Sequence, residues 1–276
     1  MSDDVEPVPA PTDTEPVRRH RWRDWRWVLS NLLILVGVLV LLYPVSTWVY
    51  AWWQQRSLEQ ELVATHPMMA QPAAEVFVAD MVPTGVDRTI FRTQEEKDKQ
   101  VVEVESLRRA AARFASEFLQ GDGSGGVPIG RVIIPKIGVD TVLVEGTGRA
   151  DLREGPGHWP ETPLPGMGGN FVVSGHRTTY GGPFFKLDKL KPGDRIDLLL
   201  PYAAASYRVT RTVVVLPSQT DVVAQRGKEE LSLATCHPIY SARQRLVVQA
   251  EMVSFKVREE KAPAGTSTGV APGGSG

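Results

Sequence analysis

The sequence has very little cysteine and almost no net charge. Its 276 residues include a single cysteine, Cys236, so no disulfide can form within the chain and stability has to come from packing. Lysine and arginine (31 residues) nearly balance aspartate and glutamate (32), for a formal net charge of -1. This balance gives no electrostatic case for a nucleic-acid partner, and we expect none. A lone cysteine is either a buried apolar side chain or a nucleophile.

Charged residues are missing between Trp27 and Gln55. This apolar run exceeds the ~20 residues that a helix needs to cross the hydrocarbon core of a bilayer. Tryptophan and tyrosine flank it, as they do at membrane–water interfaces. A cleaved signal peptide would have a shorter apolar region ending at small residues, whereas this run ends at Trp52 and Trp53. We therefore predict a transmembrane helix at residues 27–53.

Basic residues precede the apolar run. Five arginines lie between residues 18 and 26, whereas Arg56 is followed by Glu59 and Glu61 on the other side. The positive-inside rule then places the N-terminus in the cytoplasm and the rest of the chain outside. Residues 1–26 have no periodic apolar pattern and are expected to be a disordered, basic cytoplasmic tail. The sequence thus predicts a single-pass protein of the cell membrane, with the domain that follows the span outside the cytoplasm.

Residues 54–126 are predicted to form an extracytoplasmic stalk. Within them, residues 94–119 carry apolar side chains at helical spacing, which predicts an amphipathic helix that packs on the domain after it. These side chains belong to Val101, Val104, Leu107, Ala111, Phe114 and Phe118. At the other end of the chain, residues 258–276 are rich in glycine, serine, proline and alanine, and are expected to be disordered.

Residues 127–257 have the pattern of an all-β domain. Short runs of valine, isoleucine and leucine alternate there with glycine and proline turns. So many short strands in this length indicate a single closed barrel. Short helical turns are expected near residues 150–154 and 183–190. The predicted strands are residues 131–135, 140–144, 170–174, 195–200, 206–216, 230–235 and 245–255.

Cys236 lies in the segment SLATCHP. The predicted strand at residues 230–235 brings the thiol to a strand end, and Pro238 stops the pairing soon after. A thiol in that position is accessible, whereas one in mid-strand would be part of the core. Because a free thiol has a pKa of about 8.5, it needs a nearby histidine or cation to become a good nucleophile.

Three histidines lie in the predicted β domain: His158, His176 and His237. His237 follows Cys236 directly, and neighbours on an extended chain point apart. His176 comes just past an apolar strand and follows Gly175, which permits a close approach. From the residues alone, His176 is the favoured partner of the thiol, and His158 remains an alternative.

Acyl transfer also requires a group that stabilises an oxyanion. Arg243 and Arg245 both follow the cysteine, at the point where the last predicted strand begins. Arg245 leads directly into an apolar run, so strand pairing is more able to fix its position. For either arginine, the alternative is a solvated charge on a loop.

These motifs resemble those of sortases. SLATC is similar to the TLxTC motif of that family, with Ser232 in place of the first threonine, and an arginine follows nine residues after Cys236. NFVVSGHR, which ends just past His176, resembles the histidine strand of sortases. The run GPGHWPETPLPGMGGNFVVSGHRTTYGGPFFKLDKLKPGD resembles class E sortases of actinobacteria almost continuously. The resemblance covers residues 127–257 and the N-terminal anchor.

The resemblance implies a closed eight-stranded sortase-type β-barrel with short helices, preceded by a transmembrane helix and a helical stalk. It also implies a catalytic triad, in which Cys236 is the nucleophile, His176 the general acid and base, and Arg245 the residue that holds substrate and oxyanion. No lid motif precedes residue 127, which argues against a pilin-polymerising class C enzyme.

The resemblance extends to the substrate groove. Thr235, beside the nucleophile, would line this groove, and Ala234 and Tyr180 are expected to bind substrate with it. Trp159 stands where class E sortases often have a tyrosine linked to a preference for LAxTG over LPxTG. An indole has no phenolic hydroxyl, although its N–H can still donate a hydrogen bond.

The implied activity is cleavage of a C-terminal LAxTG- or LPxTG-like sorting signal between threonine and glycine. The acyl group would pass through a thioester to a cell-wall amine. The expected partners are secreted proteins that bear the signal, a peptidoglycan precursor or other amine, and the membrane. We expect no cofactor and no metal. Two other functions stay open at this point: a cell-wall cysteine hydrolase, and a non-catalytic membrane-anchored β-domain with a buried cysteine.

Overall fold

The structure, a computed structural model, describes residues 21–78, 81–83, 94–119 and 126–258. The chain divides into two compact units, Met1–Val45 and Ser46–Gly276, and helix α1 (Arg21–Thr65) contributes to both. Residues 1–20 of the predicted N-terminal tail and residues 259–276 of the predicted C-terminal tail lie outside the described residues. The prediction of disorder is wrong for residues 21–26, which begin α1, and for Arg258, which is buried and donates to the carbonyl of Met68.

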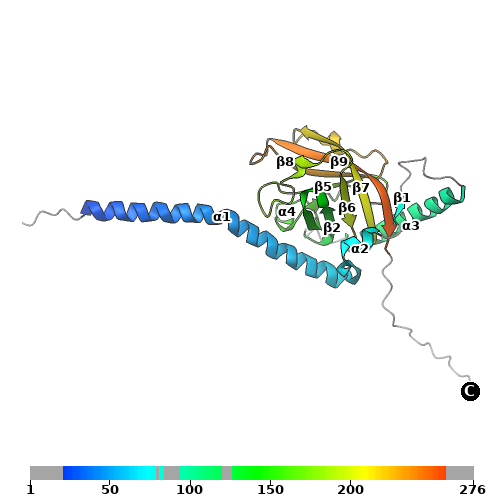
Figure 1. The fold of residues 1–276 in the computed structure, drawn as a ribbon, viewed down its shortest axis with the longest axis horizontal. Helices are drawn as coiled ribbons and strands as arrows, with labels where there is room; N and C mark the ends of the chain where they lie inside the picture. The colour runs from blue at the N-terminus through cyan, green and yellow to red at the C-terminus, as the bar shows by residue number, and fades with distance from the viewer. Residues whose placement is uncertain (1–20, 79–80, 84–93, 120–125, 259–276) are drawn as a thin grey trace, which may run out of the picture. The chain divides into compact units, whose positions relative to one another are not determined.

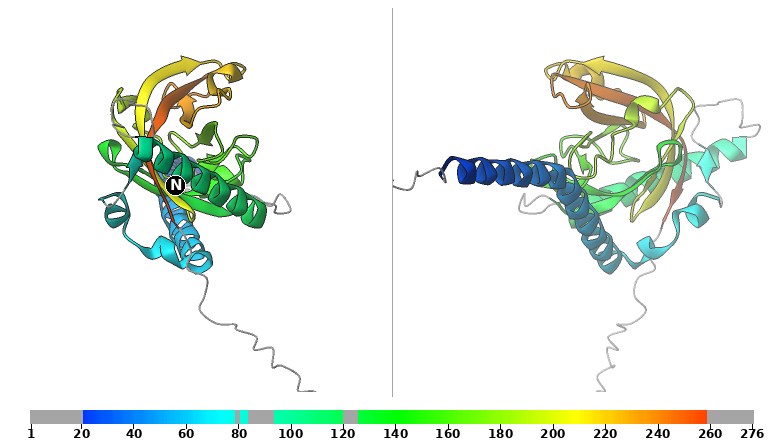
Figure 2. Two further views of the ribbon diagram at one scale, coloured as in Figure 1. Left: turned by 90° about the vertical axis from the view of Figure 1, so that its right-hand side faces the viewer. Right: turned by 60° about the vertical axis from the view of Figure 1, so that its left-hand side comes forward.

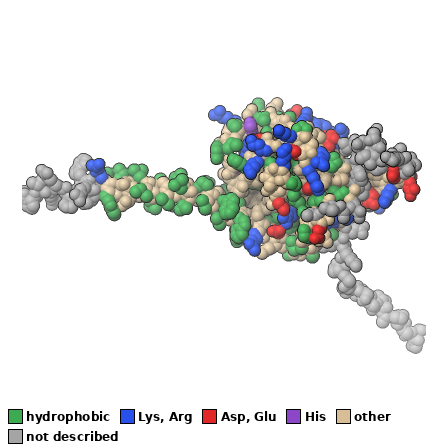
Figure 3. Space-filling model, viewed as in Figure 1, with side chains coloured by type: hydrophobic (Ala, Val, Ile, Leu, Met, Phe, Trp, Pro, Cys, Tyr) green, Lys and Arg blue, Asp and Glu red, His purple; other side chains and the backbone are tan. Residues whose placement is uncertain are grey.

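Helix α1 contains the predicted membrane segment. Among the described residues it is the one helix long and apolar enough to cross a membrane, and none of its most apolar window is buried in protein. Hydrophobic side chains lie along it (Figure 3), including Leu33 and Leu41, which are 64% and 75% exposed. Such exposure suits a lipid environment, where a helix satisfies its own backbone hydrogen bonds. Pro44 lies inside the helix and cannot donate one of those bonds.

The segments between α1 and the barrel pack on the barrel rather than standing apart from it. Leu58 and Leu62 of α1 share a buried cluster with Val142 and Val144 of the barrel wall. From α3, the apolar face packs into the main core, as its helical spacing predicts, and Figures 1 and 2 show this helix on one side of the barrel. Val101 is the exception: it was predicted to belong to this face but is 68% exposed. The elements before the barrel are α1, η1 (Pro67–Ala70), α2 (Ala73–Val78), β1 (Val82–Pro83) and α3 (Gln94–Phe118).

Of the described strands, eight close into a barrel and one extends its edge. The ring runs β9-β7-β6-β2-β3-β4-β5-β8, and β8 pairs with β9 to close it; the two-residue β1 is added to β9. This confirms the expected closed eight-stranded barrel. Its strands are β2 (Pro128–Ile134), β3 (Val139–Glu145), β4 (Gly157–His158), β5 (Asn170–Ser174), β6 (Arg195–Leu199), β7 (Ala203–Val215), β8 (Glu230–His237) and β9 (Gln244–Val257).

Some strand bounds differ from the predicted ones. Strand β4 was missed because only two residues pair in it, too few to form an alternating pattern. Strand β8 continues beyond its predicted end at residue 235, since Cys236 pairs with Arg245 and His237 pairs with Gln244. Between the strands lie η2 (Pro135–Ile137), α4 (Asp151–Glu154), η3 (Leu187–Lys189) and η4 (Thr220–Val223).

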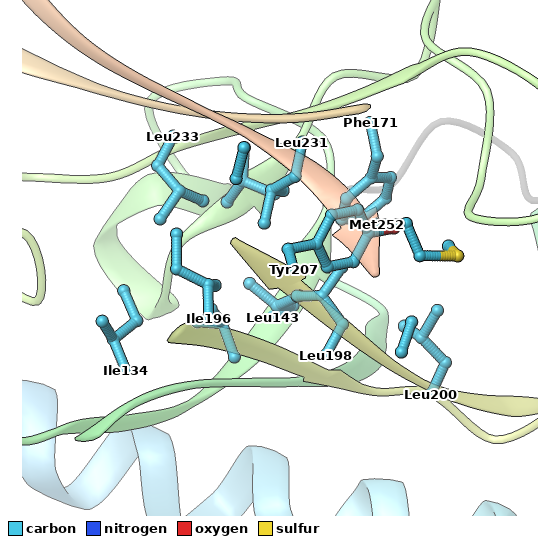
Figure 4. Packing of buried hydrophobic residues seen from close by; sticks show 14 of the residues in the cluster. Ile134, Leu143, Phe171, Ile196, Leu198, Leu200, Tyr207, Leu231, Leu233 and Met252 are labelled. Atoms are coloured by element: carbon cyan, nitrogen blue, oxygen red, sulfur yellow. The ribbon is translucent and has the colours of Figure 1, made fainter. Parts of the chain in front are cut away.

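Alternate residues of the strands fill the barrel (Figure 4). Phe171, Leu231 and Leu233 point inwards from β5 and β8, and Tyr207 from β7 is fully buried among them. Because side chains alternate across a strand, the residues between these point to the outer face. This alternation determines which side of the barrel wall receives each side chain near Cys236.

Candidate active site

The candidate catalytic residues lie at the ends of three neighbouring strands. β5 runs parallel to β8, with Ser174 beside Ala234, and β8 runs antiparallel to β9, with Cys236 opposite Arg245. The backbone N–H of Gly175 donates to the carbonyl of Ala234 over 3.0 Å, so pairing continues past the end of β5. His176 follows directly. The fold therefore brings the predicted cysteine, histidine and arginine to one edge of the barrel wall.

Cys236 belongs to the outer face of the wall. Leu233 is part of the interior core, whereas Ala234 belongs to a second cluster outside it. By alternation Cys236 shares the face of Ala234. Opposed residues of an antiparallel pair also share a face, with Cβ atoms about 4.5–5.5 Å apart, so Arg245 lies beside the cysteine. The thiol is free and partly exposed, which leaves it open to a substrate.

An apolar wall borders the cysteine on this outer face. Trp159 packs against the wall and donates its indole N–H to Ser174 Oγ over 2.7 Å. That proton is thus engaged within the protein. Ala234, expected to bind substrate, lies two residues before the thiol on the same face. The wall consists of Val172, Val223, Ala234 and Val247, with Trp159, Val213, Val215 and Val222 packed against them.

His176 is half-buried in the loop that follows β5. Burial lowers its pKa, and the positive charge of Arg153 lowers it further. Both effects favour the neutral imidazole, which can accept a proton from a thiol. The ring of Tyr180 lies against it, with centroids 5.1 Å apart. Tyr180, predicted to bind substrate, therefore contacts the candidate base directly.

His158, the alternative base, is a buried part of the barrel. It is 1% exposed, and its ring stacks on Phe171 at 4.5 Å. Its Nδ1 lies 2.7 Å from Glu145 Oε2, and its Nε2 lies 3.1 Å from the carbonyl of Thr162. With both ring nitrogens occupied and no access to solvent, His158 has a structural role. Of the two candidates, His176 is the one that directly follows the strand paired with β8, near the end of β8 that carries Cys236.

The two candidate arginines differ in how they are held. Arg245 pairs within β9 and donates from Nη1 to the carbonyls of Ala242 (2.9 Å) and Gln244 (3.0 Å). Arg243 precedes the strand and is exposed. Ladder pairing therefore fixes the backbone of Arg245 next to Cys236, and its guanidinium keeps donors that those two carbonyls leave free.

Thr235 has a different place from the one expected. It points to the interior side of β8, is 3% exposed and donates from Oγ1 to the carbonyl of Gly175 over 2.8 Å. Alternation explains this, because Thr235 and Cys236 are sequence neighbours on one strand. Thr235 therefore links β8, which carries Cys236, to the segment after β5 that leads to His176. It does not line the outer face of the wall, where substrate was expected to bind.

Arg177 joins the same two segments, and nothing in the sequence indicated its role. It is 3% exposed, and its Nη1 donates to the carbonyl of Cys236 (3.2 Å) and to His237 Nδ1 (2.9 Å). Its Nη2 pairs with Asp188 at 3.2 Å. A charged residue after a strand is usually solvated, and only the close approach of the two loops makes this one a buried link.

The chemistry available at this edge is that of covalent acyl transfer. A reachable thiol can attack a carbonyl, a neutral imidazole can take and return the proton, and a guanidinium can stabilise the oxyanion. Within the described residues, no group of three or more histidine, cysteine, aspartate or glutamate side chains is arranged to hold a metal ion.

Comparisons of the sequence with known proteins identify one family. A family model described as "Sortase domain" matches residues 132–253. Sortase D of Bacillus subtilis (strain 168) is 35% identical over 198 residues, covering 70% of this chain and 89% of that protein. Sortase SrtE1 of Streptomyces coelicolor is 27% identical over 221 residues, covering 72% of this chain and 63% of that protein. The structure of sortase E from Streptomyces avermitilis matches at 33% identity with a TM-score of 0.43, over 47% of this chain and 90% of that one.

Proposed function

Because this chain belongs to the sortase family of cysteine transpeptidases, we propose that Cys236, His176 and Arg245 carry out its reaction. The observation that supports these roles most is the strand register, which opposes Cys236 to Arg245 and continues beside the strand that leads into His176. The lowered pKa of His176 supports its role as the base that first accepts a proton.

In the first half of the proposed reaction, the sulfur of Cys236 attacks the threonine carbonyl of a sorting signal. His176 takes the thiol proton as the C–S bond forms, and the guanidinium of Arg245 stabilises the oxyanion. The C–N bond to glycine then breaks, and His176 gives the proton to the leaving amine. The product of this half is a thioester on Cys236 and a released C-terminal fragment.

In the second half, an amine of the cell wall attacks the thioester. His176 removes a proton from the attacking nitrogen, a C–N bond forms, and the C–S bond breaks. The sulfur leaves as a thiolate and regains its proton from His176. Peptidoglycan precursor is the proposed amine, because it is linked to lipid in the same membrane as the enzyme.

We place the membrane span in the N-terminal part of α1. Ala51 is 7% exposed against the catalytic unit, so we end the span before it and not at residue 53, the end predicted from the sequence. Residues 27–47 would rise about 32 Å at ~1.5 Å per residue, enough to cross the hydrocarbon core. The arginines before the span support a cytoplasmic N-terminus and an extracytoplasmic barrel. Tethering there raises the effective concentration of the enzyme toward exported substrates and lipid-linked amine.

We assign the enzyme to class E, on the resemblance of residues 155–194 to that class. The sorting signal would then be LAxTG-like or LPxTG-like, and Trp159 is the residue on which the choice depends. Its indole N–H already donates to Ser174. A tyrosine hydroxyl in its place would therefore offer the substrate a hydrogen-bond donor that this chain lacks. Replacing Trp159 by tyrosine, with phenylalanine as the control, should raise the preference for LAxTG in the tyrosine variant alone.

Mass spectrometry of reaction products tests the function. The full chain in detergent micelles is incubated with LAxTG and LPxTG peptides and with candidate amines. We expect an amide between the threonine carboxyl and the added amine, formed by the native chain and not by Cys236→Ala. A product that is always the free acid, at any amine concentration, would identify a hydrolase instead. Turnover by Cys236→Ala would contradict the assigned nucleophile.

A further inference from the structure

Tyr180 lies in the loop after His176 and presses an aromatic ring against the imidazole. Its backbone φ is 49°, in the left-handed region that residues other than glycine rarely adopt. A residue persists in that region when the surrounding structure holds it there. The rings of Tyr180 and His176 are tilted by 42°, with centroids 5.1 Å apart. The fold therefore maintains this contact against the backbone preference of Tyr180.

Two side chains from other elements contact the Tyr180 ring. The guanidinium carbon of Arg153, on α4, lies 5.9 Å from the ring centroid, within the range of a cation–π contact. The ring of Tyr50, on α1, meets it edge-on with centroids 6.2 Å apart and an angle of 68°. The loop also approaches the helix closely, because a Cβ added to Gly181 would lie 3.2 Å from Ala51 Cβ.

The part of α1 that carries Tyr50 is fixed to the barrel by Gln55. The Gln55 Oε1 accepts hydrogen bonds from the backbone N–H of Val142 (2.8 Å) and from Thr141 Oγ1 (2.7 Å). Its Nε2 donates to the carbonyl of Glu154 over 2.8 Å. One side chain thus joins α1 both to β3 and to the end of α4. This part of α1 is therefore held in place beside the loop that contains Tyr180.

We propose that Tyr180 is a positioning residue for His176, and that Tyr50 of α1 and Arg153 of α4 hold it in place. The proposal rests on the catalytic role given to His176 above. It makes residues 48–65 of the membrane-anchoring helix, which follow the proposed span, part of the support for the active site. Tyr180 then acts through the histidine, rather than by contact with substrate.

The physical effect of this arrangement is on the protonation of His176. The Tyr180 ring displaces water from beside the imidazole, and Arg153 adds a positive charge near it, so both disfavour the imidazolium. Removing either should raise the pKa of His176. The other titratable or charged groups on the elements packed here, beside Tyr180 itself, are Arg177 next to His176, Asp151 and Glu154 on α4, Tyr50 and Arg56 on α1, and Cys236, His237 and Arg245 on β8 and β9.

The test is the pKa of His176, measured by NMR of histidine-labelled full chain in detergent micelles and assigned with a His176→Gln variant. Tyr180→Leu removes the ring and Tyr180→Phe keeps it. Arg153→Gln removes the charge and Arg153→Lys keeps it. Tyr50→Leu removes the support from α1, and its matched control is Trp53→Leu, an aromatic residue of the same helix that is 60% exposed.

We expect the pKa of His176 to rise in the three variants that remove ring, charge or support, and to stay unchanged in the three controls. The acid limb of kcat/KM should move to higher pH in the same three, because it follows the loss of neutral imidazole. At neutral pH, kcat/KM should fall roughly 10- to 100-fold in Tyr180→Leu through loss of positioning.

An unchanged His176 pKa in Tyr180→Leu overturns the positioning role, and an unchanged value in Tyr50→Leu overturns the part given to α1. If Tyr180→Leu does not fold, Arg153→Gln and Tyr50→Leu decide the question. A loss of activity in Tyr180→Phe equal to that in Tyr180→Leu would assign the hydroxyl to substrate contact and also refute the proposal. Because the NMR titration needs no turnover, a chain that fails to transpeptidate would refute the proposed function without affecting this test.

Discussion

Replacing Phe114 by alanine should strongly destabilise the catalytic unit, although this residue lies outside the barrel strands. Phe114 is 4% exposed and belongs to the main core, and its ring centroid lies 5.3 Å from those of both Tyr202 and Phe118. Truncation of a buried phenylalanine to alanine costs about 3–5 kcal/mol, the sum of lost burial and the cavity left behind. Domains are stable by only about 5–15 kcal/mol, so this loss removes a large part of the total.

The assay is thermal unfolding of the full chain in detergent, followed by circular dichroism. For a unit of this size, each kcal/mol corresponds to about 2–4 °C, so the midpoint should fall by roughly 6–20 °C. Val101→Ala on the same helix is the control, because Val101 is 68% exposed, and it should change stability by less than about 0.5 kcal/mol. Equal midpoints for Phe114→Ala and Val101→Ala would show that α3 is a tether and not part of the core.

Two further predictions test the candidate active site and the docking of α1 that supports it. In a peptide-cleavage assay, Arg245→Lys should lower kcat/KM about as severely as Arg245→Ala, because a point charge cannot replace a planar fork of donors. Arg243→Ala should stay close to the native rate. If Arg243→Ala lost activity and Arg245→Ala kept it, the roles of the two arginines would be exchanged. Gln55→Ala should cost roughly 1–3 kcal/mol in a urea titration, because it strips a partner from the partly buried backbone N–H of Val142; no change in the urea midpoint would contradict the docking of α1.

The barrel and the cysteine–histidine pair could be predicted because local signals determine them. A run of consecutive apolar residues indicates β5, and alternating apolar residues indicate β8. Each pattern ends next to a residue able to act in catalysis. Sequence position favours His176, because it follows an apolar strand, but the exclusion of His158 could not be made from the sequence. It depends on Glu145, which lies on another strand and engages the ring of His158.

Contacts between distant segments account for what the sequence did not reveal. The region expected to be a stalk has an apolar stripe, which predicted packing, but no local pattern indicated that Leu107 and Phe114 would complete the barrel core. Likewise, Arg153 and Tyr50 are far from His176 in the chain, and only the docking of α1 and α4 brings them to Tyr180. Long-range packing of this kind has no periodic signature in one sequence.

Trapping of the acyl-enzyme is the most direct test of the proposed chemistry. The full chain is mixed with a sorting-signal peptide in the absence of amine, quenched in acid and digested, and the acyl group is located by mass spectrometry. The account predicts a peptide acyl group, ending at threonine, on Cys236 and on no other residue, and its loss when an amine is added. An acyl group on another side chain, or one that forms equally in Cys236→Ala, would contradict it.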